Sequence, residues 1–328
     1  MKAVRHVSPL ALVLASMTGS CGGAAPGPAT ATPSDPGERT EAAQVCEAGD
    51  AAACYNLGVR YHEGDGVAQD DRRAAELFAA ACETEHGRAC FNLAWLLSNG
   101  TSVGNDGPRA AELYRRACDI EQPTACTNLG YLLHTGELVD IDVAGALAAF
   151  EEGCAADDLV GCYEVARMLA GGEGTDRDDA QAAELYGRAC EGQVPLACDR
   201  LAMMYEHGRG VPQDDERAVA LYGASCEAGG AIACTNLGGM VEDGRGVARD
   251  AARAGTLYER ACAAEDSYGC NNFGVLHHRG AGVTRDPVRA AALFDQACQL
   301  GLDIGCSNAN RVREGAGAGV MRALDRRE

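Results

Sequence analysis

The segment Cys46-Glu-Ala-Gly-Asp-Ala-Ala-Ala-Cys54 is the best predictor of the fold, because its pair of cysteines recurs along the chain at a fixed interval. Each cysteine recurs every 36 residues, and the eight-residue spacing within a pair never changes. The pairs are Cys46 and Cys54, Cys82 and Cys90, Cys118 and Cys126, Cys154 and Cys162, Cys190 and Cys198, Cys226 and Cys234, Cys262 and Cys270, and Cys298 and Cys306. A fixed period of about 20 to 50 residues is typical of stacked supersecondary units, so the chain is predicted to be a repeat array.

The residues between successive cysteine pairs predict two helices in each repeat. Leu57 and Tyr61 continue the face of Cys54 at helical steps, and the glycines of Gly64-Asp-Gly-Val67 suit the left-handed end of that helix. An aspartate, which is a strong helix N-cap, then recurs in each repeat: Asp70, Asp106, Asp142, Asp178, Asp214, Asp250 and Asp286. A second apolar stripe follows over residues 74–81. Each repeat is therefore expected to be an antiparallel helix pair, in an all-α fold without strands.

The spacing within each cysteine pair predicts a disulfide across a turn. In one unbroken helix the two sulfurs would begin about 12 Å apart along the axis, which is beyond disulfide reach. The segment Glu47-Ala-Gly-Asp50 supplies a turn, so we expect Cys46 to end one helix and Cys54 to begin the next. Zinc is the competing explanation, but paired zinc ligands usually lie about two to four residues apart. Paired cysteines in a secreted chain favour disulfides, so every pair is predicted to be bridged and no metal site is expected.

The charge balance argues against nucleic acid as a partner. The 328 residues include 28 Lys and Arg against 48 Asp and Glu, which gives a formal net charge of −20. Phosphate binding needs a clustered cationic surface, which this composition does not offer. The only lysine is Lys2, so a catalytic or Schiff-base lysine is excluded from the mature chain. No cofactor is predicted.

The amino terminus has the pattern of an export signal. Lys2 and Arg5 precede a short apolar run over residues 10–17, in the order found in secretory signal peptides. The run is too short for an ordered membrane-spanning helix. Residues 1–20 are therefore predicted to be a lipoprotein-type signal peptide.

The segment Thr18-Gly-Ser-Cys21 resembles the cleavage site of bacterial lipoproteins, so Cys21 is expected to become a lipidated first residue. Ordinary secretion with a free thiol at this position is the alternative. Residues 21–37 are rich in Gly, Ala, Pro and Thr and predict a disordered linker after the lipid. The expected location is the periplasm or the outer membrane, with the lipid as the only membrane contact.

Three segments of the repeats resemble a known family. Ala89-Cys-Phe-Asn-Leu93, Gly208-Arg-Gly-Val211 and Arg109-Ala-Ala-Glu-Leu-Tyr114 are similar to Sel1-like repeats. The 36-residue period and the paired cysteines narrow the resemblance to the disulfide-rich branch that includes the Helicobacter cysteine-rich proteins. This resemblance implies a right-handed α/α superhelix (a solenoid) related to tetratricopeptide arrays, with a concave face lined by first helices. The third repeat departs from the pattern at Gly136-Glu-Leu-Val139, which lacks the second glycine.

The repeats divide the folded part of the chain into a core and two ends. Residues 38–45 are expected to form an N-terminal capping half-helix. Residues 46–297 then contain seven 36-residue repeats, and residues 298–328 contain a partial eighth repeat with a C-terminal cap. Capping units of this kind protect the ends of a solenoid from solvent.

Solenoids bind extended ligands on a concave surface, and two recurring positions of the first helix would meet such a ligand. The first position carries mostly asparagine, whose amide offers donors and acceptors to a peptide backbone; the predicted residues are Asn56, Asn92, Asn128, Glu164, Arg200, Asn236 and Asn272. The second position varies, as a specificity surface would; the predicted residues are Trp95, Tyr131, Arg167 and Met203. The alternative is that the asparagines only bond the backbone of neighbouring helices. The expected partner is a protein or peptide, including a peptide derived from peptidoglycan.

An enzyme is the rival to a binding scaffold. Some proteins of the resembled branch are described as binding or weakly hydrolysing β-lactams, so a β-lactamase-like hydrolase of peptidoglycan-related substrates is the alternative function. The serine route needs Ser-x-x-Lys, which a mature chain without lysine lacks. His62, His134 and His278 lie in separate repeats without metal-ligand spacing. No catalytic residue is predicted, and a purely structural envelope spacer is the third hypothesis.

Overall fold

The computed structural model describes most of the chain as helices. The described ranges are residues 43–100, 102–120 and 122–324, with side chains up to residue 314. Every regular element in these ranges is helical and none is a strand, so the all-α prediction is confirmed. None of these helices has both the length and the apolar character that crossing a bilayer requires.

The predicted export and anchoring segments lie outside the described residues. These are the signal peptide over residues 1–20, the lipidation site Cys21 and the linker over residues 21–37. Of the expected half-helix over residues 38–45, the structure describes only the end, within a short helix over residues 43–47.

The helices form a series of antiparallel hairpins joined by short loops. The first helices of the hairpins are α2 (Ala51–Glu63), α4 (Gly87–Ser98), α6 (Pro123–Thr135), α8 (Leu159–Gly171), α10 (Pro195–His207), α12 (Ala231–Asp243), α14 (Ser267–Arg279) and α16 (Asp303–Leu324). The second helices are α3 (Asp71–Glu83), α5 (Gly107–Asp119), α7 (Val143–Ala155), α9 (Asp179–Glu191), α11 (Asp215–Glu227), α13 (Ala251–Ala263) and α15 (Pro287–Gln299). The chain packs as two units, Met1–Arg177 and Asp178–Glu328, which we call unit 1 and unit 2.

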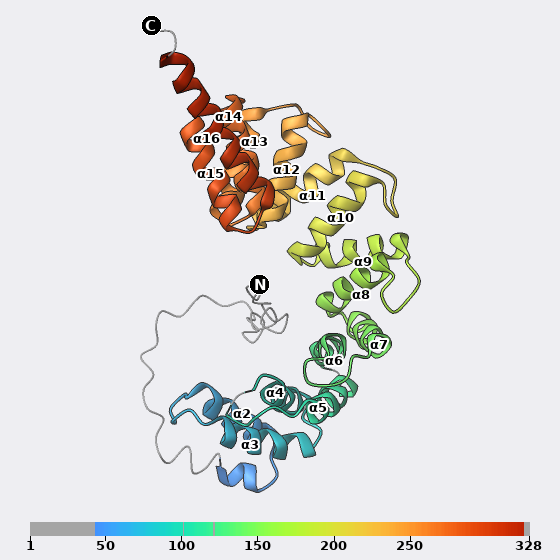
Figure 1. Cartoon of the computed structure of the whole chain (residues 1–328). Coiled ribbons are helices and arrows are strands. Elements are labelled where there is room, and N and C mark those ends of the chain that lie inside the picture. Colours follow the sequence, from blue (N-terminus) through green and yellow to red (C-terminus); the bar gives the residue numbers. More distant parts are fainter. Residues whose placement is uncertain (1–42, 101, 121, 325–328) are drawn as a thin grey trace. The chain divides into compact units, whose positions relative to one another are not determined.

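Each unit is a stack of two layers of helices. In unit 1, α4, α6 and α8 lie in a row on one side, and α5 and α7 lie on the other (Figure 1). Consecutive helices pack against each other along the stack, as in α3 with α4 and α4 with α5. Each hairpin therefore buries its apolar faces against its neighbours in sequence, as expected for a solenoid.

The predicted helix-end signals are present in the structure. The Asp70 carboxylate accepts hydrogen bonds from the backbone N–H groups of Arg72 and Arg73, and the recurring aspartates cap the other second helices in the same way. Gly64 ends α2 with φ of 74°, and Gly66 has φ of 66°. These left-handed conformations favour glycine, so the loop sequence explains where the first helix ends.

The third repeat compensates for its missing glycine. In the fifth, sixth and seventh repeats the second loop glycine touches the start of the preceding second helix; a Cβ on Gly210 would lie 2.0 Å from the Asp179 carbonyl oxygen. The second repeat has Ser102 at this loop position. In the third repeat Leu138 occupies the loop position, and Gly107 lies at the start of α5, the second helix of the preceding repeat. A Cβ on Gly107 would lie 2.1 Å from the Leu138 carbonyl oxygen. The close backbone contact between loop and helix is therefore kept in the third repeat, with the glycine on the helix side of the contact and not on the loop side.

All of the predicted disulfides are formed; seven join consecutive hairpins, and Cys46–Cys54 joins the short helix over residues 43–47 to α2. Cys82 lies near the end of α3 and Cys90 in the first turn of α4, with their Cα atoms 4.8 Å apart. The Cα separations of the eight bridges range from 4.4 to 4.9 Å. Each of the seven bridges between hairpins holds the turn that leads from a second helix to the next first helix.

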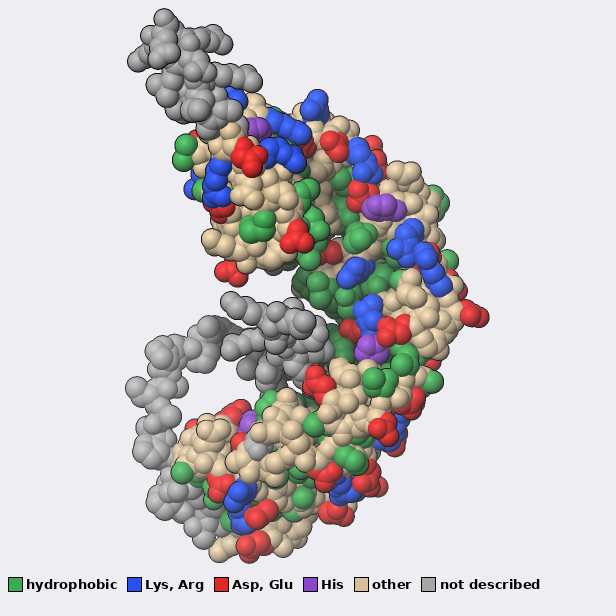
Figure 2. Space-filling view, in the orientation of Figure 1, with side chains coloured by type: hydrophobic (Ala, Val, Ile, Leu, Met, Phe, Trp, Pro, Cys, Tyr) green, Lys and Arg blue, Asp and Glu red, His purple; other side chains and the backbone are tan. Residues whose placement is uncertain are grey.

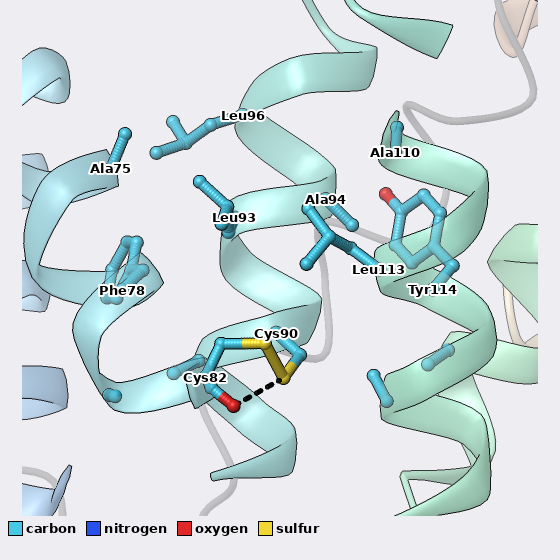
Figure 3. Packing of buried hydrophobic residues seen from close by; sticks show 14 of the residues in the cluster. Ala75, Phe78, Cys82, Cys90, Leu93, Ala94, Leu96, Ala110, Leu113 and Tyr114 are labelled. Carbon is cyan, nitrogen blue, oxygen red and sulfur yellow. Dashed lines mark hydrogen bonds between the residues drawn. A yellow bond between two sulfur atoms is a disulfide. The ribbon is translucent and has the colours of Figure 1, made fainter. Parts of the chain in front are cut away.

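The core is built from alanine, leucine and one buried ring in each second helix. Figure 3 shows Phe78 of α3 and Tyr114 of α5 on either side of α4, with the Cys82–Cys90 bridge at the edge of the cluster. A small residue of the first helix faces each ring, such as Gly58 against Phe78 and Ala94 near Tyr114. These small residues let the ring approach the helix backbone closely. One ring in each second helix is therefore enough to fill the space between the helices.

Candidate ligand-binding surface

Some first helices of neighbouring repeats lie against one another within each unit. In unit 1, α6 contacts α8; in unit 2, α12 contacts α14 and α14 contacts α16. Second helices make no comparable contact with each other in the described part of the chain. The first helices are therefore closer together than the second helices, which puts them on the inner side of the local curvature. We call the surface that they form in each unit the first-helix face.

The predicted asparagine position is exposed in some repeats and buried in others. Asn56 is exposed and Asn92 is half-buried, whereas Asn128 is only 2% exposed. In three repeats the asparagine interacts with the hydroxyl group of a tyrosine on the preceding second helix and acts to lower its pKa; the pairs are Asn128 with Tyr114, Asn236 with Tyr222, and Asn272 with Tyr258. The hydroxyls themselves are hydrogen-bonded to the first helix of the preceding repeat, at Ser98, Glu206 and Glu242. Part of the asparagine series therefore packs beside buried tyrosines between neighbouring helices.

The tyrosines of these pairs are held in their neutral form. Burial raises the pKa of Tyr114, Tyr222 and Tyr258 far above its usual value. The Asn128 carbonyl oxygen is buried and has no hydrogen-bond partner. Asn128 is therefore enclosed in the packing between repeats and is not accessible to a large ligand.

Three predicted residues of unit 1 meet in one network between α6 and α8. The Tyr131 hydroxyl donates to Glu164 at 2.8 Å, and the Arg167 guanidinium donates to the other oxygen of Glu164 at 2.7 Å. Arg167 also donates to Glu173 at 2.8 Å, and His134 lies 2.8 Å from the second Glu173 oxygen. His134 and Glu173 complete this network but were not predicted from the sequence, because Glu173 lies in the loop after α8, far along the chain from His134.

The charges of this network compensate one another. Burial acts to raise the pKa of Glu173, but hydrogen bonds from Arg167 and His134 outweigh it and lower the pKa. Burial acts to lower the pKa of Arg167, and the two carboxylates raise it above its ordinary value. The network therefore links two first helices and already uses the charged groups of Glu164 and Arg167.

A hollow of about 450 Å³ opens on the first-helix face of unit 1, beside the single tryptophan. Trp95 and Asn92 of α4 line it, together with the rings of Tyr55, Phe78 and Phe91. It combines an aromatic wall with polar groups, which is the usual composition of a recognition pocket.

Two polar side chains of this hollow differ in their surroundings: His62 is already hydrogen-bonded, and Arg88 is exposed. The His62 ring lies 2.7 Å from the Asp71 carboxylate and meets the Trp95 ring edge-on, with 5.6 Å between ring centroids. Arg88 is exposed at the rim and makes no ion pair with any other described residue. An Arg88 guanidinium in this setting is suited to bind a carboxylate or a backbone carbonyl of a ligand.

A second hollow of about 670 Å³ lies on the first-helix face of unit 2. The predicted residues that line it are Arg200, Met203, Asn236 and Asn272. Ile232 and Tyr268 line the same hollow, although the sequence analysis did not single them out. The structure thus groups most of the predicted positions into separate clusters: the Trp95 hollow, the Tyr131 network and the hollow of unit 2, with Asn56 and the buried Asn128 outside all three.

The described residues contain one group of side chains close enough to hold a metal ion, and its chemistry does not fit one. It consists of Cys118, Cys126 and Glu152. The two cysteines form a disulfide with each other, so their sulfurs are not available as thiolate ligands.

Charges are mixed over the surface. Figure 2 shows acidic and basic side chains interspersed on the visible face, with apolar side chains between them. The negative net charge is therefore distributed over many sites on this face, and local charge has to be judged at each hollow separately.

Comparison with known proteins identifies the repeats. The family described as Sel1 repeat matches seven consecutive segments: residues 51–84, 87–120, 123–151, 159–194, 195–230, 231–266 and 267–302. Together these segments cover well over half of the chain. No curated protein matches the sequence.

Two solved structures share the fold, and a third is similar only over a short stretch. The crystal structure of c5321, a protective antigen of uropathogenic Escherichia coli strains that displays an SLR fold, matches with a TM-score of 0.76 and 26% identity, over 81% of this chain and 57% of that chain. A Sel1 repeat protein from Oxalobacter formigenes matches with a TM-score of 0.71 and 20% identity, over 84% and 80%. Helicobacter pylori cysteine rich protein B matches with a TM-score of 0.33 and 22% identity, over 40% and 93%.

Proposed function

This chain belongs to the Sel1 repeat family, whose members are scaffolds for protein–protein interaction, and from this premise we propose that it is a non-catalytic binding scaffold of the bacterial cell envelope. The proposed ligand is an extended segment of a protein, or a peptide derived from peptidoglycan. It binds to the first-helix face, where consecutive repeats present equivalent positions to successive parts of the ligand.

The observation that carries this proposal is the hollow beside Trp95. Trp95 is only half-buried and lies next to Arg88, which is exposed and makes no ion pair with any residue that the structure describes, so the hollow provides apolar contact and a directed polar contact together. Asn92 lines the same hollow and offers amide groups to a peptide backbone. The Tyr131 network does not offer this, because its charged groups already bind each other.

Two features support the envelope location. Disulfides persist in oxidising compartments such as the periplasm, and this chain places one at each turn between consecutive hairpins. The sequence of residues 1–21 has the order of a signal peptide followed by a lipidated cysteine. Labelling of cells with radioactive palmitate tests the anchor: label that is lost in Cys21→Ala supports it, and an unlabelled native chain contradicts it.

Site-specific photo-crosslinking in intact cells tests the binding surface. A benzophenone side chain at Asn92 is expected to capture a discrete protein or peptide, and Trp95→Ala in the same chain should strongly reduce the yield. The matched control places the benzophenone at Glu76, which is exposed on α3 and outside the first-helix face. Equal capture from both positions, or no capture from Asn92, would refute the proposed surface.

A further inference from the structure

Unit 2 exposes a row of large apolar side chains that its core does not use. They occupy the same position on four consecutive first helices: Leu196, Ile232, Tyr268 and Ile304, which are 45%, 57%, 58% and 53% exposed. We call this row the apolar ladder. The equivalent positions of unit 1 carry Ala52, Arg88, Thr124 and the half-buried Val160 on α2, α4, α6 and α8, so unit 1 has no such row of exposed large apolar side chains. Contiguous exposed apolar side chains of this size are typical of an interaction site.

The spacing of the apolar ladder indicates the conformation of its ligand. Packed helices lie about 8 to 10 Å apart, so one ladder step is about 9 Å. A polyproline II segment rises about 9 Å for every three residues and returns to the same face with that period. A β-strand returns to the same face after about 7 Å, which drifts out of register after one or two steps. The ladder therefore fits a polyproline II segment with an apolar side chain at every third residue.

The polar groups beside the ladder favour this conformation over a helix. Asn236 and Asn272 line the same hollow as Ile232 and Tyr268. The Asn272 amide oxygen accepts one hydrogen bond, from Asn271, and both amides retain further donors and acceptors. A polyproline II segment leaves its backbone N–H and C=O groups unbonded, so it can bond these amides, whereas a helical ligand satisfies its own backbone.

The charges around the hollow favour a basic ligand. The lining residues include three acids, Glu206, Asp243 and Asp266, and two arginines. Arg245 is already bonded to Glu206 and to Asp215, at 2.8 Å each. The other arginine, Arg200, is exposed, so three acidic side chains against two arginines give the lining a formal net charge of −1. Asp243 is exposed and makes no ion pair within the described ranges, so it offers an acidic group to a ligand.

We propose that the apolar ladder of unit 2 binds a polyproline II segment of another protein, with apolar side chains at every third position and basic residues between them. This inference rests on the proposed scaffold function for the class of partner, and it adds the partner's conformation, periodicity and charge. It also assigns a second binding surface, separate from the Trp95 hollow of unit 1.

Fluorescence anisotropy with synthetic peptides and the oxidised mature chain tests the proposal. The ladder spans about ten residues of polyproline II, so the probe is a labelled peptide of Ile-Pro-Lys repeats of that length. A shuffled peptide of equal composition, a peptide with Glu in place of Lys, and a helical heptad peptide are the comparisons. We expect the Ile-Pro-Lys repeat to bind at least about tenfold more tightly than each of them. Equal binding of the shuffled peptide, or tighter binding of the acidic or the heptad peptide, overturns the proposal.

Variants of the chain locate the binding site. Ile232→Ser and Tyr268→Ser should each weaken binding of the repeat peptide about tenfold, because each removes one apolar side chain from the contact. The control is Val288→Ser on α15, since Val288 is 82% exposed but lies outside the apolar ladder. All three positions are exposed, and circular dichroism verifies that the variants fold.

The variant results separate this inference from the proposed function. Unchanged binding in both ladder variants, or an equal loss in Val288→Ser, refutes the ladder. If no peptide binds while the benzophenone at Asn92 still captures a partner, the ladder is wrong and the scaffold function stands. If the peptide binds through the ladder while Asn92 captures nothing, the Trp95 surface is wrong and the ladder stands.

Discussion

Replacing Gly107 with alanine should destabilise the contact between the second and third repeats, even though alanine is the better helix former. The new Cβ would lie 2.1 Å from the Leu138 carbonyl oxygen, whereas ordinary contacts of this kind begin near about 3.4 Å. The loop after α6 must therefore move by more than about 1 Å, and overpacking of this kind costs about 1 to 3 kcal/mol. The gain in helix propensity is at most about 1 kcal/mol. The expected net loss of local stability is about 2 kcal/mol.

A second substitution tests the cause of this loss. Leu138→Gly gives the third loop the two-glycine pattern seen at Gly208 and Gly210, so Gly107→Ala/Leu138→Gly resembles the other repeats. Leu138→Gly alone costs stability, because the side chain packs against the core of unit 1. The double variant should be more stable than the sum of the single changes predicts, by about 1 kcal/mol or more.

Native-state hydrogen exchange measures these local free energies of opening. Amides of α5 and α6 report the local stability around the contact between Gly107 and Leu138, and amides of α13 and α14 in unit 2 are the internal control. Two results would refute this reasoning: strictly additive effects of the two substitutions, or a Gly107→Ala variant as stable as the native chain. Either would show that Gly107 does not compensate for the missing loop glycine.

Three further perturbations have defined outcomes. Cys154→Ala/Cys162→Ala opens a nine-residue ring and should cost about 2.5 kcal/mol of chain-entropy stabilisation, seen as faster hydrogen exchange in α7 and α8; unchanged exchange would contradict this. Glu173 has a lowered pKa, so its contribution is complete above the ordinary value near about 4.3 and is lost as pH falls through the folded value; melting curves of Glu173→Gln should lack that acid dependence. Burial raises the pKa of Asp199, so folding favours its protonated form and loses stability as pH rises through the folded value; Asp199→Asn should raise Tm at pH 7 but not near about pH 3.

The repeat architecture could be predicted from the sequence because periodicity reports it directly. One invariant interval places every cysteine pair, and the N-cap aspartates and loop glycines recur with the same period. The chemistry at each position is local: Asp70 caps the helix that begins at the next residue, and Cys82 reaches Cys90 across one turn. Such short-range relations need no knowledge of tertiary packing.

The binding surface was harder to predict, because equivalent positions do not have equivalent surroundings. Trp95 and Tyr131 are one repeat apart, yet Trp95 lines an open hollow while Tyr131 is bonded to Glu164 of the next first helix. That difference depends on which residue the neighbouring repeat presents, Asn128 after Trp95 but Glu164 after Tyr131. A single repeat does not contain this information.

The exposed apolar residues were missed for a related reason. An isoleucine such as Ile232 at a helical position is ordinarily assigned to the core, and only packing shows that it faces solvent. The comparison of equivalent positions along the chain could have found it, because the position changes from Arg88 and Thr124 to Ile232 and Tyr268 between the units.

Hydrogen exchange of the chain with its bound partner, captured through Asn92 and then prepared in purified form, tests the binding account most directly. If the partner binds to the first-helix face, exchange should become slower in α4, and also in α12 and α14 when the partner occupies unit 2. Exchange in α3 and α13 should be unchanged. Protection confined to α3 and α13 would place the partner on the opposite layer of helices and contradict the assignment.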